Sequence, residues 1–180
     1  MNTRHMQFLT RAIDFPAGYT IKYVKDTNGN AIKSLVNNTM MKIILEEPIK
    51  TGESLTFSIG WSYHITDRSM FLLSREGYEY FPEDDNTVYL IANWFPRMAV
   101  YSDTEGWQNK QFNRLGEFAL EFGDYDVEIT VPADHLVAAT GALNNEAEVL
   151  TKTQRQRLEA ARKSVDKTVK IDPPAEAKAN

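Results

Sequence analysis

The chain has 180 residues, a formal net charge of −5 and no cysteine, which excludes disulfides, thiolate metal ligands and cysteine nucleophiles. Its acidic balance gives no reason to expect nucleic acid or an anionic membrane surface as a partner. Every apolar run falls well short of the roughly 20 residues that cross a bilayer, and the first residues lack the apolar stretch of a signal peptide, so we expect neither element in this chain.

Alternation of apolar and polar residues predicts a series of β-strands in the first half of the chain. The expected strands cover residues 19–25, 31–36, 40–46, 54–64, 78–81 and 87–92. The longest alternation is in residues 54–64, and its large side chains would share one face: Leu55, Phe57, Ile59, Trp61 and Tyr63. Such a face is typical of one half of a β-sandwich interface. Residues 65–77 and the acidic stretch 82–86 are predicted loops.

The first strand is predicted to end in a tight turn. Tyr19, Ile21 and Tyr23 would share one face of this strand, and the sequence DTNGN follows at residues 26–30. Asn-Gly between two strand-like runs is a strong hairpin signal, because both residues tolerate positive φ. The five residues also resemble the start of a calcium loop, but its twelfth position, which should be a bidentate Glu, is Asn37. We therefore predict a turn.

Three further strand patterns follow in the second half of the chain, at residues 118–122, 125–131 and 135–140. The middle pattern is the most regular. Its apolar members would face one way and its polar members the other, as in a half-buried strand. The apolar members are Tyr125, Val127, Ile129 and Val131.

An aromatic loop between Trp94 and Trp107 interrupts these patterns, and it also contains Phe95 and Tyr101 beside several charged residues. Large aromatics and charges on a connection between strands are typical of a binding rim. The alternative is that the rings only plug the open end of a β-sandwich. From pattern alone we favour the plug, because aromatic side chains most often contribute by burying area.

A change to helical sequence occurs at Thr151. The sequence TKTQ at residues 151–154 is a capping box, in which Thr and Gln satisfy backbone N–H groups of the first turn. We predict a helix over residues 152–165 with a narrow apolar stripe of Leu158, Ala161 and Val165, typical of a helix on the surface. Residues 172–180 are a predicted flexible tail, which leaves residues 1–171 as one β-rich domain.

Residues with obvious catalytic chemistry are few. The three histidines, His5, His64 and His135, have no second histidine at helical metal-ligand spacing. The sequence has neither a glycine-rich phosphate loop nor a G-x-S-x-G nucleophile motif. From its own residues, the chain is expected to be a β-rich binding or scaffold domain without enzymatic activity.

Two segments carry a resemblance to a known family. IANWFPRMAVYSDTEGWQNKQF and the following GEFALEFGDYDVEITVPADHLVAATGAL resemble the N-terminal domain of the gluzincin zinc aminopeptidases, the family of alanyl aminopeptidase and leukotriene hydrolase. The sequence of these segments is similar to that of a bacterial branch of the family, and the resemblance extends over about residues 18–169. It implies a saddle-shaped, antiparallel β-sandwich with one surface helix near the C-terminus, and we expect this chain to lack part of that domain at both ends.

The family's catalytic segments, His-Glu-x-x-His and Gly-x-Met-Glu-Asn, do not occur in this sequence. The resemblance therefore implies no catalytic residue and no zinc in this chain; zinc is expected only in the catalytic domain. That domain is the partner that the resemblance implies, and a peptide N-terminus is a second one.

One substrate contact is implied by the same resemblance. A Gln or Glu of the family helps to hold the N-terminal residue of the substrate, and the nearest position here is Asn93, flanked by Trp94 and Phe95. Asn is one methylene shorter than Gln, and the alternative is that Asn93 only ends a strand.

A stand-alone binding module is the alternative function. It would bind carbohydrate or protein through the aromatic loop, using Trp94, Phe95, Tyr101 and Trp107. Whether these rings are exposed and coplanar or buried distinguishes the two functions. Missing strands would also leave open sheet edges, and open edges pair with other chains, so we expect self-association.

Overall fold

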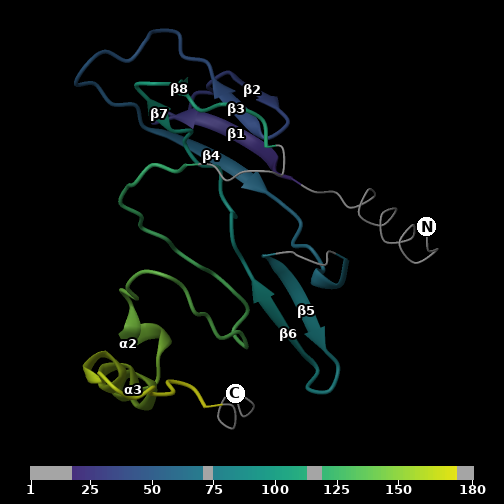
Figure 1. Ribbon diagram of the computed structural model, residues 1–180, viewed down its shortest axis with the longest axis vertical. Helices are drawn as coiled ribbons and strands as arrows, with labels where there is room; N and C mark the ends of the chain where they lie inside the picture. Colours follow the sequence, from purple (N-terminus) through teal and green to yellow (C-terminus); the bar gives the residue numbers. More distant parts are fainter. Residues whose placement is uncertain (1–17, 71–74, 113–118, 174–180) are drawn as a thin grey trace, which may run out of the picture. The chain divides into compact units, whose positions relative to one another are not determined.

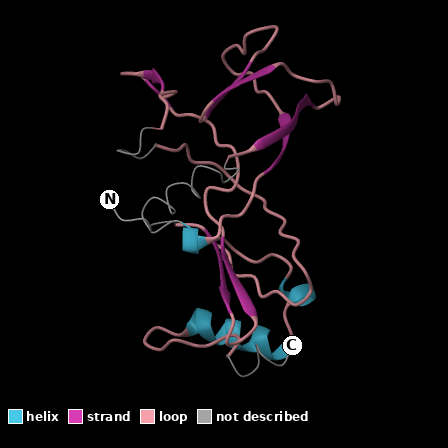
Figure 2. Cartoon of the chain, turned by 90° about the vertical axis from the view of Figure 1, so that its right-hand side faces the viewer, coloured by secondary structure: helices cyan, strands magenta, loops and turns pink. Residues whose placement is uncertain are grey.

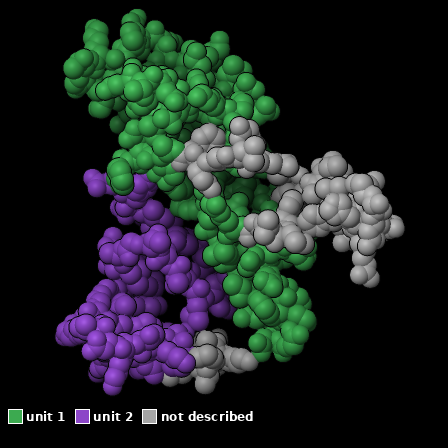
Figure 3. All heavy atoms as spheres, in the orientation of Figure 1, with its two compact units in different colours: residues 1–123 green, residues 124–180 purple. Residues whose placement is uncertain are grey.

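The computed structural model describes residues 18–70, 75–112 and 119–173. The chain divides into two compact units, Met1–Gly123 and Asp124–Asn180 (Figure 3), which are treated separately below. In the described residues, strand is more abundant than helix, and each sheet is a small antiparallel pair (Figure 2). The mainly β class and the helix near the C-terminus are confirmed, whereas the saddle-shaped sandwich and the domain 1–171 stay predictions.

The longest pair joins β1 (Thr20–Asp26) to β4 (Phe57–Ser62), from Thr20 opposite Ser62 to Asp26 opposite Phe57 (Figure 1). In β4 the predicted alternation is confirmed in part. Phe57, Ile59 and Trp61 are half-buried and Ser58 and Ser62 are exposed, but Gly60 is also half-buried. Leu55, predicted on the apolar face, lies before the strand and is exposed.

The predicted face of β1 is wrong in part. A bulge between Ile21 and Tyr23 shifts the register, so Val24 becomes the buried residue and Tyr23 is 45% exposed. A bulge inserts one extra residue and moves the following side chains to the other face. Tyr23 then lies over its ladder partner Gly60, where an added Cβ would be 2.3 Å from the ring.

The turn after β1 is confirmed. The Asp26 carboxylate accepts hydrogen bonds from the backbone N–H of Asn28 at 2.9 Å and of Asn30 at 2.8 Å, and from the Asn30 side chain at 3.0 Å. Gly29 has the positive φ of +85° that the turn requires. After it, a bridge joins Lys25 to Ala31. The predicted return strand starts only at β2 (Ser34–Asn37), which pairs with β3 (Met40–Ile43).

A third antiparallel pair, a hairpin, joins β5 (Gly77–Phe81) and β6 (Asn86–Leu90) through the predicted acidic turn. The Tyr80 hydroxyl donates to the Asp85 carboxylate at 2.8 Å and closes this turn. Before β5, a short 3-10 helix, η1 (Arg68–Met70), occupies part of the expected loop. A fourth, two-residue pair, β7 (Tyr101–Ser102) with β8 (Gly106–Trp107), lies in the aromatic loop and was not predicted.

The strands predicted in the second half are wrong. Residues 125–131 and 135–140, which the structure describes throughout, contain no strand. Of residues 118–122, Phe118 lies outside the described part, and Leu120 forms only a single bridge to Ala99. Alternation tells which side chains share a face, but a strand also needs a neighbouring backbone for its hydrogen bonds, and the pattern does not supply one.

In the second unit, α2 (Glu146–Val149), which was not predicted, precedes α3 (Lys152–Lys163). The capping box of α3 is confirmed, since the N–H of Gln154 donates to the Thr151 hydroxyl at 3.2 Å and the N–H of Thr151 donates to the Gln154 side chain at 2.8 Å. The helix ends before Val165, which is 94% exposed, so this member of the predicted stripe is wrong. No residue of α3 is buried, as expected for a surface helix.

Candidate functional site

Asn93 lies just beyond the end of β6, and its side chain is exposed. Its φ of +48° is in the left-handed region, which Asn tolerates better than most residues. Its carbonyl accepts a hydrogen bond from the Tyr19 hydroxyl, which precedes β1. The backbone at Asn93 is therefore held by a residue 74 positions away, while its amide group faces solvent.

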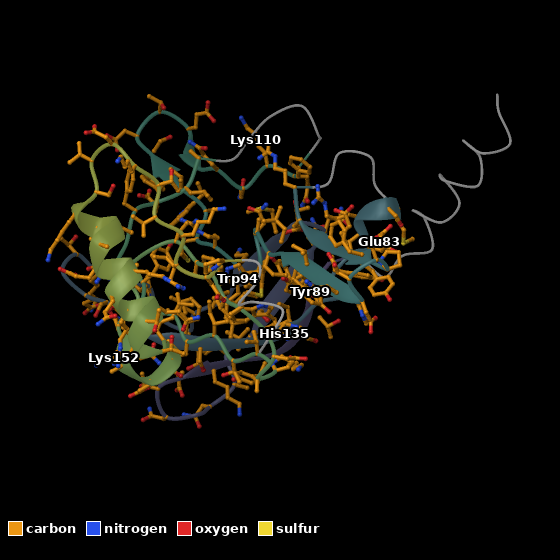
Figure 4. The ribbon with its side chains drawn as sticks, turned by 90° about the horizontal axis from the view of Figure 1, so that it is seen from below. Glu83, Tyr89, Trp94, Lys110, His135 and Lys152 are labelled. Carbon is orange, nitrogen blue, oxygen red and sulfur yellow. The ribbon has the colours of Figure 1, made fainter. Side chains whose placement is uncertain are left out.

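Trp94, labelled in Figure 4, is half-buried and is held by Trp61 of β4. The indole N–H of Trp61 donates to the Trp94 carbonyl at 2.9 Å. The two rings are 6.3 Å apart between centroids, at an interplanar angle of 31°. The alternation of β4 indicated that Trp61 faces inward, but no sequence signal linked it to Trp94.

Phe95 is also half-buried, with its ring 4.8 Å from that of Trp94 at an angle of 59°. The Arg97 guanidinium lies 5.4 Å from the centroid of the Phe95 ring, within reach of a cation–π interaction. The same guanidinium donates to the Glu121 carbonyl at 3.1 Å. Of the three predicted site residues, Asn93 is exposed, whereas Trp94 and Phe95 are half-buried.

Tyr101 and Trp107 form a separate aromatic pair on the β7–β8 hairpin. They are ladder partners, and their rings are 5.3 Å apart at an angle of 72°, edge to face. Tyr101 is 57% exposed and Trp107 is 55% exposed. The exposure of the aromatic rings was expected to distinguish a stand-alone binding module from a domain whose rings are buried. The loop contains both kinds of ring: Trp94 and Phe95 are half-buried, whereas Tyr101 and Trp107 are exposed but not coplanar.

Glu76 and two tyrosines form a polar cluster that sequence analysis missed. The rings of Tyr19 and Tyr63 are 5.7 Å apart and edge to face. Tyr63 and Glu76 line one open hollow, together with Ile65, Thr66, Gly77, Leu90 and Ile91. The space that this hollow encloses is far smaller than the roughly 300–1,000 Å³ of typical small-molecule pockets. The cluster is therefore better understood as part of the packing near β5 and β6.

Burial raises the pKa of the Glu76 carboxyl, against a smaller opposing effect of a hydrogen bond from the backbone of Ala92. Burial also raises the pKa of Tyr19 and of Tyr63, and the nearby Glu76 charge adds to both shifts. Since Ala92 immediately precedes Asn93, the hydrogen bond from the Ala92 backbone to Glu76 also helps to hold the backbone at Asn93. Glu76 lies in a predicted loop without a motif, so no sequence signal indicated its role.

His64 and His135, the histidines in the described part of the chain, belong to no cluster of metal-ligating side chains. Within residues 18–70, 75–112 and 119–173, no group of three or more His, Cys, Asp or Glu side chains is arranged to hold a metal ion. His135 pairs with its neighbour Asp134 at 2.7 Å between Nδ1 and Oδ1, and this hydrogen bond lowers the pKa of Asp134. His5 lies outside the described residues.

Comparison of the chain with protein-family models, with curated proteins and with solved structures gives no match. None of the helices in the described part of the chain is long and apolar enough to span a membrane.

Proposed function

We propose that the chain is the non-catalytic N-terminal domain of a gluzincin zinc aminopeptidase, or a piece of it. In this role it packs on the catalytic domain as a saddle-shaped β-sandwich and lines one wall of the substrate cleft. Zinc and the residues that activate water belong to the catalytic domain, and no residue of this chain is assigned to them.

The observation that carries the proposal is the amount of uncovered apolar side chain. Among the described residues, Val24 is the only buried hydrophobic one. Val127 is 47% exposed and Ile129 is 53% exposed, although both belong to the most regular alternating pattern of the sequence. Burial of one such side chain contributes about 1.5–3 kcal/mol, so a face of this kind favours contact with a partner surface.

Asn93 supports the second part of the proposal. Its backbone carbonyl is held by Tyr19 and the next carbonyl by Trp61, while its side-chain amide is exposed. An amide on a backbone held at two points loses little conformational entropy when it binds. The side-chain amide oxygen of Asn93 would accept a hydrogen bond from the amino group of a peptide N-terminus. Trp94 and Phe95 would flank this contact as parts of the wall.

Identification of the natural protein tests the proposal directly. An antibody against this chain would be used to capture the protein from a lysate of the source organism. We expect a polypeptide several-fold larger than 20.6 kDa that hydrolyses aminoacyl-nitroanilides, loses this activity to a chelator and regains it with zinc. A captured protein of 20.6 kDa without chelator-sensitive hydrolysis would exclude the proposal.

Paired substitutions test the packing surface. In the natural protein, Val127→Thr with Ile129→Thr should lower the temperature at which aminopeptidase activity is lost, because a buried apolar face becomes polar. The matched control at polar positions of the same segment, Glu128→Gln with Thr130→Ser, should leave that temperature unchanged. In the isolated chain, neither pair should shift the urea midpoint, since Val127 and Ile129 are already exposed.

A stand-alone binding module remains the second candidate, and the exposure of Tyr101 and Trp107 favours it. Exposed aromatic side chains on a hairpin are suitable for stacking against a sugar ring or a protein surface. Titration with neutral oligosaccharides, followed by tryptophan fluorescence, tests this function. A fluorescence response that Trp107→Phe abolishes and Trp94→Phe retains would support the binding-module function. The absence of a response would count against carbohydrate as the ligand.

A further inference from the structure

We propose that Asn28 is a site of spontaneous deamidation through a succinimide, and that the Asp26 carboxylate sets the rate by holding the turn around it. Asn28 and Gly29 form the one Asn-Gly pair of the sequence. Glycine has no side chain to shield the backbone nitrogen that reacts, and a Cβ added at Gly29 would have no heavy atom within 4 Å. Asn28 is itself exposed, so water has access to both steps of the reaction.

The chemistry needs only the chain and water. The backbone nitrogen of Gly29 attacks the side-chain carbonyl carbon of Asn28, and a new C–N bond closes a five-membered ring. The bond from that carbon to the amide nitrogen breaks, and the nitrogen leaves as ammonia with the proton that the Gly29 nitrogen has lost. Water then opens the ring at one of its two carbonyls and yields aspartate or isoaspartate. No oxidant, reductant or other co-reactant takes part.

The hydrogen bonds of the turn oppose this reaction in the folded chain. The Gly29 N–H donates to the Asp26 carbonyl at 3.1 Å, and this bond must open before the nitrogen can attack. On either side of the reacting peptide, the N–H groups of Asn28 and Asn30 both donate to Oδ1 of Asp26. Hydrogen bonds to a carboxylate are stronger than those between neutral groups, so Asp26 is a positioning residue that restrains the loop.

Isoaspartate would change the turn because it adds a methylene to the main chain. The turn is closed by the Asp26 N–H, which donates to the Asn30 carbonyl at 3.0 Å, and by the bridge between Lys25 and Ala31. A longer main chain cannot keep both contacts in this geometry. The product also adds a carboxylate two residues from Asp26, and like charges that come close repel each other. We therefore expect local loosening at the end of β1.

Peptide mapping by mass spectrometry tests the proposal on the full chain. Samples would be incubated in native buffer and, in parallel, in urea at the same pH. In native buffer, conversion should occur at Asn28 and not at Asn86 or Asn109, which are also exposed but precede the larger residues Thr87 and Lys110. Asn28→Gln should remove the signal. If Asn28 keeps its amide in native buffer while the unfolded chain is converted, the assignment of the site is wrong.

Asp26 variants test the restraint separately. In native buffer, Asp26→Ala should raise the conversion rate at Asn28 by about tenfold, because two hydrogen bonds that restrain the reacting peptide are lost. Asp26→Asn should give a rate between those of the original chain and of Asp26→Ala, since its side-chain oxygen still accepts from both N–H groups but is neutral and forms weaker hydrogen bonds than the carboxylate. In urea, all three chains should react equally fast. Equal rates in native buffer would exclude a role for Asp26.

Discussion

The pair β1–β4 and the run 125–131 have the same kind of sequence but different structures. Both alternate apolar with polar residues, yet β1 and β4 pair over their length, whereas residues 125–131 form no strand. The partners in β1 and β4 are more than 30 positions apart in sequence. The difference shows that alternation selects a face, while a ladder requires a partner that the local pattern does not specify.

The two regions also differ in their long-range hydrogen bonds. Near β4 and β6, Trp61 donates to Trp94 and Tyr19 donates to Asn93, across 33 and 74 positions. In the second unit, a backbone hydrogen bond that follows residues 125–131 is local, from the N–H of His135 to the carbonyl of Pro132. Side chains that bridge distant segments hold the loops of the first unit, so removing such a bridge should loosen that unit.

Removal of Trp61 should have the largest effect. Trp61→Ala loses both the ring contact with Trp94 and the hydrogen bond to its carbonyl. We expect a loss of about 3 kcal/mol in the free energy of unfolding, at the low end for a large aromatic side chain because Trp61 is half-buried. Trp61→Phe keeps a smaller aromatic ring and loses the donor and part of the ring contact, so it should cost less, about 1–2 kcal/mol. Urea unfolding followed by circular dichroism measures both.

Trp107→Ala is the matched control for this substitution. Its side chain is 55% exposed on the β7–β8 hairpin, so the same change should cost less than about 1 kcal/mol, as for most exposed positions. If Trp61→Ala and Trp107→Ala have equal effects, the bridge between β4 and the aromatic loop does not stabilise the unit.

Gln111 should have the next largest effect. Its side-chain oxygen accepts from the N–H and the hydroxyl of Thr39, at 3.0 and 2.8 Å, and its amide donates to the Asn37 carbonyl at 2.8 Å. Gln111→Ala frees the β2–β3 turn, and we expect a loss of about 1 kcal/mol because these groups are exposed to water. Hydrogen exchange at the Thr39 amide is the sensitive measurement. Gln108→Ala, which leaves these three bonds intact, should not change that exchange.

Local structure was predicted well from the sequence because local rules determine it. The Asn-Gly turn and the acidic turn after β5 depend on residues within five positions, as does the capping box of Thr151 and Gln154. The bulge in β1 was missed because nothing in the alternation marks the extra residue. The strand predicted at 125–131 was wrong because pairing depends on segments far away in the chain.

The candidate site was predicted less completely. The position of Asn93 beyond a strand and the aromatic character of the loop follow from the sequence. The partners that hold the site, Tyr19, Trp61 and Glu76, lie between 17 and 74 positions away, and no spacing rule connects them. Their contacts arise only when β1, β4 and β6 are in place.

Glu76 gives the smallest expected effect and a test by pH. Burial raises the pKa of this carboxyl, so the fold favours the protonated form. Its contribution to stability is therefore fully present below the unfolded pKa, about 4.3 for Glu, and is lost as the pH rises through the folded pKa. Glu76→Gln keeps an acceptor for the Ala92 N–H and has no charge. At pH 7 it should raise the free energy of unfolding by about 0.5 kcal/mol or less, since the group is partly solvated and screened.

Glu79 on β5 provides a control for Glu76 with the opposite sign. It pairs with Arg68 at 3.5 Å on the surface, so Glu79→Gln should lower stability at pH 7 slightly, by about 0–1 kcal/mol. The two variants should therefore diverge in urea midpoints at pH 7. Below the unfolded pKa the Glu76 variant should match the original chain, because the carboxyl is then protonated in both states. A Glu76 variant that is less stable at pH 7 would mean that its charge stabilises the fold through its tyrosine and backbone neighbours, and that burial is not the dominant effect.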